Sequence, residues 1–196
     1  MLSAGNYRCM KILLASNSPR RRELLSALSD NVTIAPSREV DETYPATLAP
    51  DEVAPYLSAV KSEAYKDLAV DDTILVTADT VVICDGRILG KPADRDEAIA
   101  MLTLLSGRSH HVVTGVTLRK GDAVVIFAET TEVVFSRLEP DEIDRYVERY
   151  RPYDKAGAYG IQEWIGYVGI ESIHGDYYNV MGLPLHRLYQ YIKRLG

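Results

Sequence analysis

Three consecutive arginines at the start of a predicted helix are the first feature of this sequence that could do chemistry. Residues 16–19 (SNSP) end in a good helix N-cap and a proline suited to the first helical position, and Arg20, Arg21 and Arg22 follow. A helix N-terminus binds anions readily but disfavours cations, so a bound polyphosphate would offset the repulsion among the arginines. The alternative is a solvated basic face, or a cluster of ion pairs with nearby acids.

An acidic side chain inside a long apolar segment is the second feature. Asp79 lies within residues 73–84 (TILVTADTVVIC), which are typical of a buried strand. A carboxylate there is unfavourable unless it is paired or binds a metal. Asp79, joined by Glu42 in a polar loop, could supply the oxygens that a hard divalent cation requires, or could align and deprotonate water. The alternative is an Asp at a bend or an exposed edge.

Two lysines and a glycine-rich segment are weaker signals. Lys91 lies between Gly90 and Pro92, which fix the direction of its side chain, and Lys61 lies on a predicted helix. Residues 155–162 (KAGAYGIQ) permit close backbone approach, either to a ligand or between two packed elements. Phosphate hydrolysis depends mainly on positioning and electrostatic stabilisation, and the anion site, the buried acid and the lysines together suit it.

Composition and missing motifs exclude several classes of protein. The chain has 196 residues, 46% of them hydrophobic, enough for one domain or two small lobes. A net charge of −6 argues against a nucleic-acid binder. No apolar run approaches the ~20 residues of a membrane span and no leader peptide opens the chain, so we expect a cytoplasmic location. The cysteines, Cys9 and Cys84, have no metal-binding spacing, and P-loop, GxGxxG, HExxH and GxSxG motifs are missing.

The elements that must position these residues alternate between strands and helices, with hairpins inserted, which predicts an α/β fold with a mixed sheet. After residue 162 we expect one or two further strands. Residues 1–9 do not resemble a structural element, so we expect an extension before a single domain at 10–196 that begins at Met10. The expected strands are residues 11–15, 32–35, 73–84, 87–89, 111–118 and 124–135, and the expected helices are residues 19–28, 51–68, 94–107, 140–150 and 184 onwards.

Seven ordered motifs make the sequence similar to the Maf family of nucleotide pyrophosphatases, also called septum formation proteins. They are LLASNSPRRRELL (13–25), VDE (40–42), ADTVV (78–82), GKP (90–92), LSGRSHHVVTGV (105–116), KAGAYGIQ (155–162) and VMGLP (180–184). The resemblance implies a mixed α/β sheet flanked by helices, with two lobes around a deep cleft, often in a homodimer. It also implies hydrolysis of the α–β bond of a nucleoside triphosphate with a divalent metal, Mg²⁺ or Mn²⁺.

The resemblance further implies roles for individual side chains. Asp79 would accept a proton from the attacking water, and Glu42 would join it at the metal. Gln162 carries both a donor and an acceptor, as the Watson–Crick edge of thymine or uracil does. The triphosphate would be held by Ser16, Arg20, Lys61 and Lys91, and the choice of dTTP and UTP, with modified pyrimidines left open, would depend on Arg21, Thr80 and Gln162.

Two other classes of function compete with an enzyme. The older family name suggests a regulator of cell division that acts by binding a partner, and its effect would survive Asp79→Asn. A nucleic-acid-binding module could use the helix with Arg20 and Arg22, and its affinity would fall steeply with salt.

Overall fold

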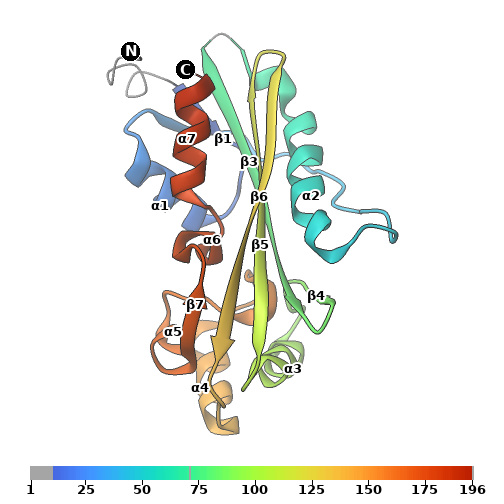
Figure 1. Cartoon of the computed structure of the whole chain (residues 1–196), viewed down its shortest axis with the longest axis vertical. Helices are drawn as coiled ribbons and strands as arrows, with labels where there is room; N and C mark the ends of the chain where they lie inside the picture. Colours follow the sequence, from blue (N-terminus) through green and yellow to red (C-terminus); the bar gives the residue numbers. More distant parts are fainter. Residues whose placement is uncertain (1–10, 71, 196) are drawn as a thin grey trace. The chain divides into compact units, whose positions relative to one another are not determined.

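A mixed sheet is the frame of the fold, and the prediction of an α/β architecture is confirmed. The structure, a computed structural model, describes residues 11–70 and 72–195, and the sheet in this part has seven strands in the hydrogen-bonded order β2-β1-β3-β5-β6-β7, with β4 paired to β3 (Figure 1). β1 pairs in parallel with β2 and β3, whereas β3–β4 and β6–β7 are antiparallel. The strands are β1 (Lys11–Leu14), β2 (Val32–Ile34), β3 (Thr73–Cys84), β4 (Arg87–Leu89), β5 (Ser109–Lys120), β6 (Ala123–Phe135) and β7 (Ile170–His174).

The described chain divides into two compact units. The first contains residues 11–70, 72–79, 114–129 and 182–195, and the second contains residues 80–113 and 130–181. β3 passes from the first unit to the second between Asp79 and Thr80. Residues 1–9, Met10 and Cys9 lie outside the described residues, so the predicted extension and start site stay predictions.

In the first unit, helices cover both faces of the sheet. α1 (Pro19–Leu28) and α7 (Leu185–Leu195) lie side by side on one face, and α2 (Pro50–Ala64) lies on the other (Figure 1). α7 buries Leu188 and Ile192, four residues apart, which is the helical period of a one-sided apolar face. β1 buries Ile12 and Leu14 by the two-residue period of a strand.

The contact between α2 and β5 is unusually close. A Cβ built at Gly115 would lie 2.2 Å from the backbone nitrogen of Pro55, so no other residue fits without moving the helix. Nearby, the Ser58 hydroxyl lies 2.8 Å from that of Thr117, and Thr77 donates to the Ser58 carbonyl at 2.7 Å. These bonds satisfy buried polar groups and fix the helix one turn before Lys61.

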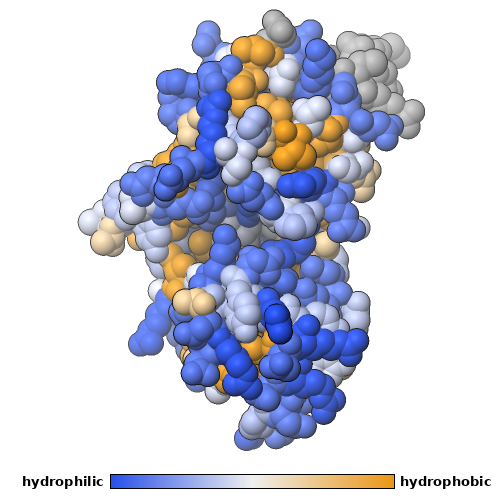
Figure 2. All heavy atoms as spheres, turned by 180° about the vertical axis from the view of Figure 1, so that it is seen from behind, coloured by the Kyte–Doolittle hydropathy of each residue, from blue (hydrophilic) through white to orange (hydrophobic). Residues whose placement is uncertain are grey.

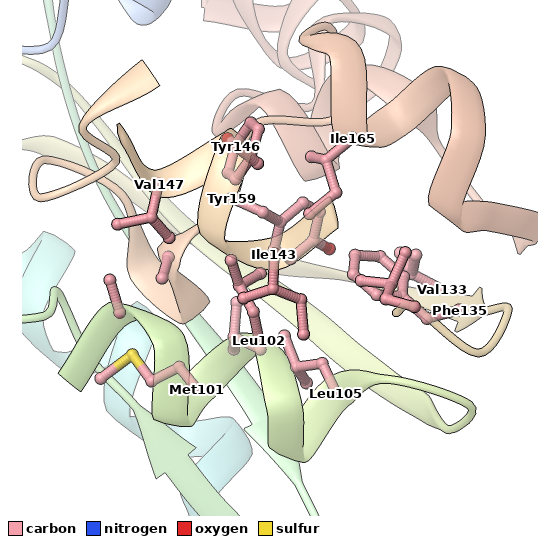
Figure 3. Close-up of a cluster of buried hydrophobic side chains, with 14 of the residues drawn as sticks. Met101, Leu102, Leu105, Val133, Phe135, Ile143, Tyr146, Val147, Tyr159 and Ile165 are labelled. Atoms are coloured by element: carbon pink, nitrogen blue, oxygen red, sulfur yellow. The ribbon is translucent and has the colours of Figure 1, made fainter. Parts of the chain in front are cut away.

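The second unit is built around one apolar cluster. Its helices are α3 (Arg95–Leu105), α4 (Pro140–Tyr150), the 3-10 turn η3 (Ala156–Ala158), α5 (Trp164–Gly169) and α6 (Tyr177–Met181). Leu102 and Leu105 of α3 meet Ile143 and Val147 of α4 in the cluster, and the rings of Tyr146 and Tyr159 lie in the same group (Figure 3). Cys84 is a free buried cysteine in this core, and burial raises the pKa of its thiol.

Two sequence predictions need correction. The helix predicted at 51–68 ends at Ala64 and is followed by the 3-10 turn η2 (Lys66–Leu68), because buried Tyr65 leaves helical geometry and its hydroxyl accepts from the Arg38 backbone N–H at 2.7 Å. After residue 162 the sequence predicts one or two strands, and one is present as β7, but the segment begins with α5, in which the buried residues Ile165 and Gly169 are four apart. A short apolar run does not distinguish strand from helix by itself.

The face drawn in Figure 2 is mainly hydrophilic, with separated apolar patches. Within residues 11–70 and 72–195, no helix combines the length and the apolar character needed to cross a membrane.

We expect Gly115→Ala to destabilise the fold by about 1–3 kcal/mol or more, because the added methyl group overlaps the α2 backbone, which cannot move as a flexible side chain would. Urea unfolding would measure the loss. Gly90→Ala is the matched control, since nothing lies within 4 Å of a Cβ there and Gly90 has no positive φ. Equal midpoints for the two variants would contradict the close approach.

Candidate active site

The predicted strand, turn and helix N-terminus are present in the first unit. Ser18 is the N-cap of α1, its hydroxyl accepts from the Arg21 backbone N–H at 3.4 Å, and Pro19 occupies the first turn. The Ser18 backbone N–H in turn donates to the Ser16 hydroxyl at 3.2 Å. The first turn contains no acidic residue, so the helix dipole and the arginines keep this end of the helix positive.

A lysine with two carboxylates is the centre of the site in this unit. The Lys61 ammonium lies 2.6 Å from Asp79 Oδ1 and 3.1 Å from Glu42 Oε2. Lys61 and Asp79 are largely buried, with 15% and 13% of their side chains exposed, whereas Glu42 is 51% exposed. The three residues come from a helix, a strand and a loop, so the fold assembles a charged cluster from distant parts of the sequence.

The ion pair explains how Asp79 is tolerated in an apolar strand. β3 buries Leu75, Val76 and Ala78 completely or almost so, and a lone carboxylate beside them would be unstable. Lys61 supplies the opposite charge and a hydrogen bond, which compensate the burial of the Asp79 carboxylate. The structure therefore confirms that the buried acid is paired.

The two carboxylates also fit a divalent cation. Both present an oxygen within 3.1 Å of one nitrogen, so their oxygens converge on a single small region. In residues 11–70 and 72–195 no group of three or more His, Cys, Asp or Glu side chains could hold a metal on its own. Mg²⁺ is commonly bound by one or two carboxylates together with substrate phosphates and water, and this donor set suits that mode.

Arg21 is used differently from a simple phosphate ligand. Its Nε donates to the Gly182 carbonyl at 2.8 Å and its Nη1 donates to the Ala78 carbonyl at 2.8 Å. Burial lowers the pKa of the guanidinium, and the charge of Arg20 lowers it further, while Asp79 and Glu42 raise it. Arg21 therefore ties α1 to the residue before Asp79 and to the segment that leads into α7.

The remaining predicted residues belong to the second unit. Thr80 directly follows Asp79 in β3 and is partly buried, and Lys91 is exposed between β4 and α3. The carbonyl of Gly90 accepts from the backbone N–H of Gly157 at 3.0 Å, which joins the GKP segment to the glycine-rich segment. The glycine-rich segment is thus packed tightly inside its own unit, as one of the two sequence interpretations expected.

Gln162 has a side-chain acceptor without a partner. Its Oε1 is buried and accepts no hydrogen bond within the described part of the chain, while its backbone carbonyl accepts from the Tyr167 hydroxyl at 2.8 Å. A buried polar atom without a partner is unfavourable and calls for an explanation, such as a ligand that donates to it.

Comparison with known proteins identifies the family. Residues 11–195 match the Maf-like protein family. The chain belongs to this family. A dTTP/UTP pyrophosphatase of Porphyromonas gingivalis strain ATCC 33277 is 53% identical over 97% of both chains. One of Bacteroides thetaiotaomicron is 48% identical over 97% of this chain and 99% of that one, and one of Flavobacterium psychrophilum is 42% identical over 93% of both. A solved HAM1 protein of Coxiella burnetii is a more distant neighbour, 18% identical, with a TM-score of 0.49 over 94% of this chain and 99% of that one.

Sequence reasoning on this Maf-like chain missed two features. The family resemblance assigns Lys61 to the triphosphate alone. Its contacts with Asp79 and Glu42 were not predicted, because sequence spacing does not show which residues of different elements meet. Sequence reasoning also overlooked Glu163, whose carboxylate lies beside Tyr146, although an acid directly after the glycine-rich motif was visible.

We expect Arg21→Met to destabilise this Maf-like protein by about 2 kcal/mol. Relief of charge repulsion at a helix N-terminus amounts to ~0.3–1 kcal/mol, whereas a hydrogen bond from a charged group contributes ~1.5–3 kcal/mol, so the loss is larger. Arg22→Met, at an exposed position in the same turn, removes the same charge and should leave the urea midpoint unchanged or slightly higher. Equal midpoints for the two variants would show that the carbonyl contacts of Arg21 do not stabilise the fold.

Proposed function

We propose that this protein hydrolyses dTTP and UTP to the nucleoside monophosphate and diphosphate. The observation that carries the proposal is the Lys61 cluster, which combines a paired, largely buried acid on β3 with a second carboxylate and a cation. Support for the substrates comes from the relatives named dTTP/UTP pyrophosphatase at 42–53% identity over most of the chain.

In the proposed reaction, the Asp79 carboxylate accepts a proton from a water molecule. The resulting hydroxide adds to the α-phosphorus, the bond from that phosphorus to the α–β bridging oxygen breaks, and diphosphate leaves with the bridging oxygen. Lys61 orients the Asp79 carboxylate for this step through its 2.6 Å bond. No covalent intermediate is needed, since positioning and electrostatic stabilisation account for most catalysis of phosphate transfer.

A divalent metal, Mg²⁺ or Mn²⁺, is part of the proposal. Asp79 and Glu42 would hold it, and it would neutralise charge that develops on the phosphate oxygens. Glu42 is suited to this role because it lies in an exposed loop, so it can turn from Lys61 to a cation at low energetic cost.

The phosphate groups would bind to the positive end of α1 and to lysines. Ser16 and Arg20 belong to the strand–turn–helix segment, where the helix dipole and the arginine side chains favour an anion. Lys61 and the exposed Lys91 would add charge, since ammonium groups bind phosphate as point charges.

The base would be recognised through Arg21, Thr80 and Gln162. The buried Gln162 Oε1 needs a donor, and the N3–H of thymine or uracil is one. A site built to hydrogen-bond a base discriminates strongly, because a base without the matching group leaves buried polar atoms unpaired. Arg21 would act here indirectly, through the backbone that it holds.

A homodimer belongs to the same proposal on the family resemblance, and a cytoplasmic location belongs to it on the sequence features described above. Binding of nucleic acid is not expected, given the net charge of −6, and a membrane is not expected as a partner because no apolar run approaches the length of a membrane span. A role in cell division by partner binding alone is not favoured by any feature of the described residues.

A nucleotide panel tests the proposal. With Mg²⁺ present, dTTP and UTP should yield diphosphate much faster than CTP, GTP, ATP or 7-methyl-GTP, and EDTA should abolish turnover until Mg²⁺ or Mn²⁺ is restored. Orthophosphate as product would mean that another bond is cut. Activity that persists with EDTA would contradict the metal, and diphosphate from 7-methyl-GTP alone would contradict the substrate assignment.

We expect Asp79→Asn to lower turnover of dTTP by ~10²–10⁴-fold, the usual range for loss of a general base. The amide keeps the size of the side chain but accepts a proton poorly. Asp122→Asn, in the exposed turn between β5 and β6, is the matched control and should turn over dTTP normally. Near-normal turnover in Asp79→Asn would remove Asp79 from the role of base.

A further inference from the structure

The backbone around Gln162 is held by one buried hydroxyl. Residues 160–163 form a tight turn in which the Glu163 N–H donates to the Gly160 carbonyl at 3.0 Å. The Tyr146 hydroxyl accepts from the Gly160 N–H at 3.0 Å and donates to Oε2 of Glu163. One side chain of α4 therefore binds both ends of the turn, and Gln162 is the third residue of that turn.

The other carboxylate oxygen of Glu163 is also occupied. The Lys155 ammonium lies 3.2 Å from Glu163 Oε1 and 2.8 Å from Asp154 Oδ1, and only 9% of the Lys155 side chain is exposed. A buried ion pair that is fully hydrogen-bonded holds its geometry, since breaking it leaves an uncompensated charge. Lys155 and Tyr146 together fix both oxygens of Glu163 next to Gln162.

Packing leaves the turn little freedom. A Cβ at Gly160 would lie 2.9 Å from the carboxyl carbon of Glu163, so the carboxylate lies directly against the backbone. The ring of Tyr146 is fully buried in the core and stacks on Tyr150 with centroids 5.0 Å apart (Figure 3). Burial and the bond to Glu163 raise the pKa of the Tyr146 hydroxyl, so it stays protonated and can donate.

The fixed turn carries a side-chain acceptor, Gln162 Oε1, that has no hydrogen-bond partner among the described residues. This oxygen is buried, whereas the turn that carries it is bonded at both ends and at its own carbonyl. A turn whose backbone is hydrogen-bonded, but whose side-chain amide oxygen has no partner, is typical of a site that is preorganised for a ligand.

We propose that Tyr146, backed by Glu163 and Lys155, is a positioning residue for base selection, because its hydroxyl fixes the turn that presents the Gln162 amide. The inference rests on the proposed function, in which Gln162 reads the pyrimidine base. Displacement of a binding group by about 1 Å can change rates ~10²-fold, so a loosened turn should weaken discrimination before it affects phosphate binding.

The test is Tyr146→Phe, which removes one oxygen and keeps the buried ring. We expect KM for UTP to rise ~10-fold with kcat little changed, and the preference for UTP over CTP, as a ratio of kcat/KM values, to fall by a similar factor. Inhibition by inorganic tripolyphosphate should be unchanged, because it has no base. Tyr150→Phe is the matched control: its hydroxyl makes no hydrogen bond in the described part of the structure, and its kinetics should match the native protein.

Glu163→Gln provides an independent variant. The amide oxygen can still accept from Tyr146, but the charge opposite Lys155 is lost, so we expect a smaller loss of preference in the same direction. If Tyr146→Phe and Glu163→Gln keep the native preference for UTP over CTP, the positioning role is wrong. An equal weakening of tripolyphosphate, UTP and CTP would indicate general loosening and would also overturn it.

The kinetics of the native protein distinguish failure of the proposed base recognition from failure of the positioning role of Tyr146. If it shows no preference between UTP and CTP, the proposed base recognition fails, whatever the variants do. If the native preference is present and the Tyr146 variant retains it, only the positioning role fails.

Discussion

The burial of one carboxylate on an apolar strand is the constraint on which the first unit depends. Asp79 needs an opposite charge, and Lys61 supplies it at 2.6 Å. Lys61 reaches Asp79 because α2 lies against β5, and that approach is possible because Gly115 has no side chain. The close packing of α2 on β5 therefore determines whether Lys61 reaches Asp79.

The arginines at the start of α1 follow the same physics. Their charges repel each other and the helix dipole, and from the sequence a bound polyphosphate would offset this. The structure offsets part of the repulsion internally, since Arg21 donates to the carbonyls of Ala78 and Gly182 and lies in the field of Asp79 and Glu42. Main-chain carbonyls thus hold Arg21, an arrangement that none of the sequence interpretations includes.

Sequence patterns predicted the elements more fully than the contacts. The two-residue period of β1 and the cap before α1 are local signals, so the strand and the helix could be located to within a residue or so. The segment from Trp164 to Gly169 was misassigned because a short apolar run fits either period. The bonds from Lys61 to Asp79 and from Tyr146 to residues 160–163 join separate elements, and only the tertiary fold brings such residues together.

The proposed groups divide between the units by chemical task. The acid, its lysine and the positive helix end belong to the first unit, and Gln162 with its supporting turn belongs to the second. The triphosphate is common to all the substrates, so loss of a protein group that acts on it changes the turnover of every substrate alike. Loss of a protein group that contacts the base changes the ratio of turnover between substrates. Asp79, proposed for the triphosphate, and Thr80, proposed for the base, are consecutive in β3. Arg21 bonds to the carbonyl of Ala78, the residue directly before them. In the proposed function, a change in Arg21 should therefore affect both tasks at once.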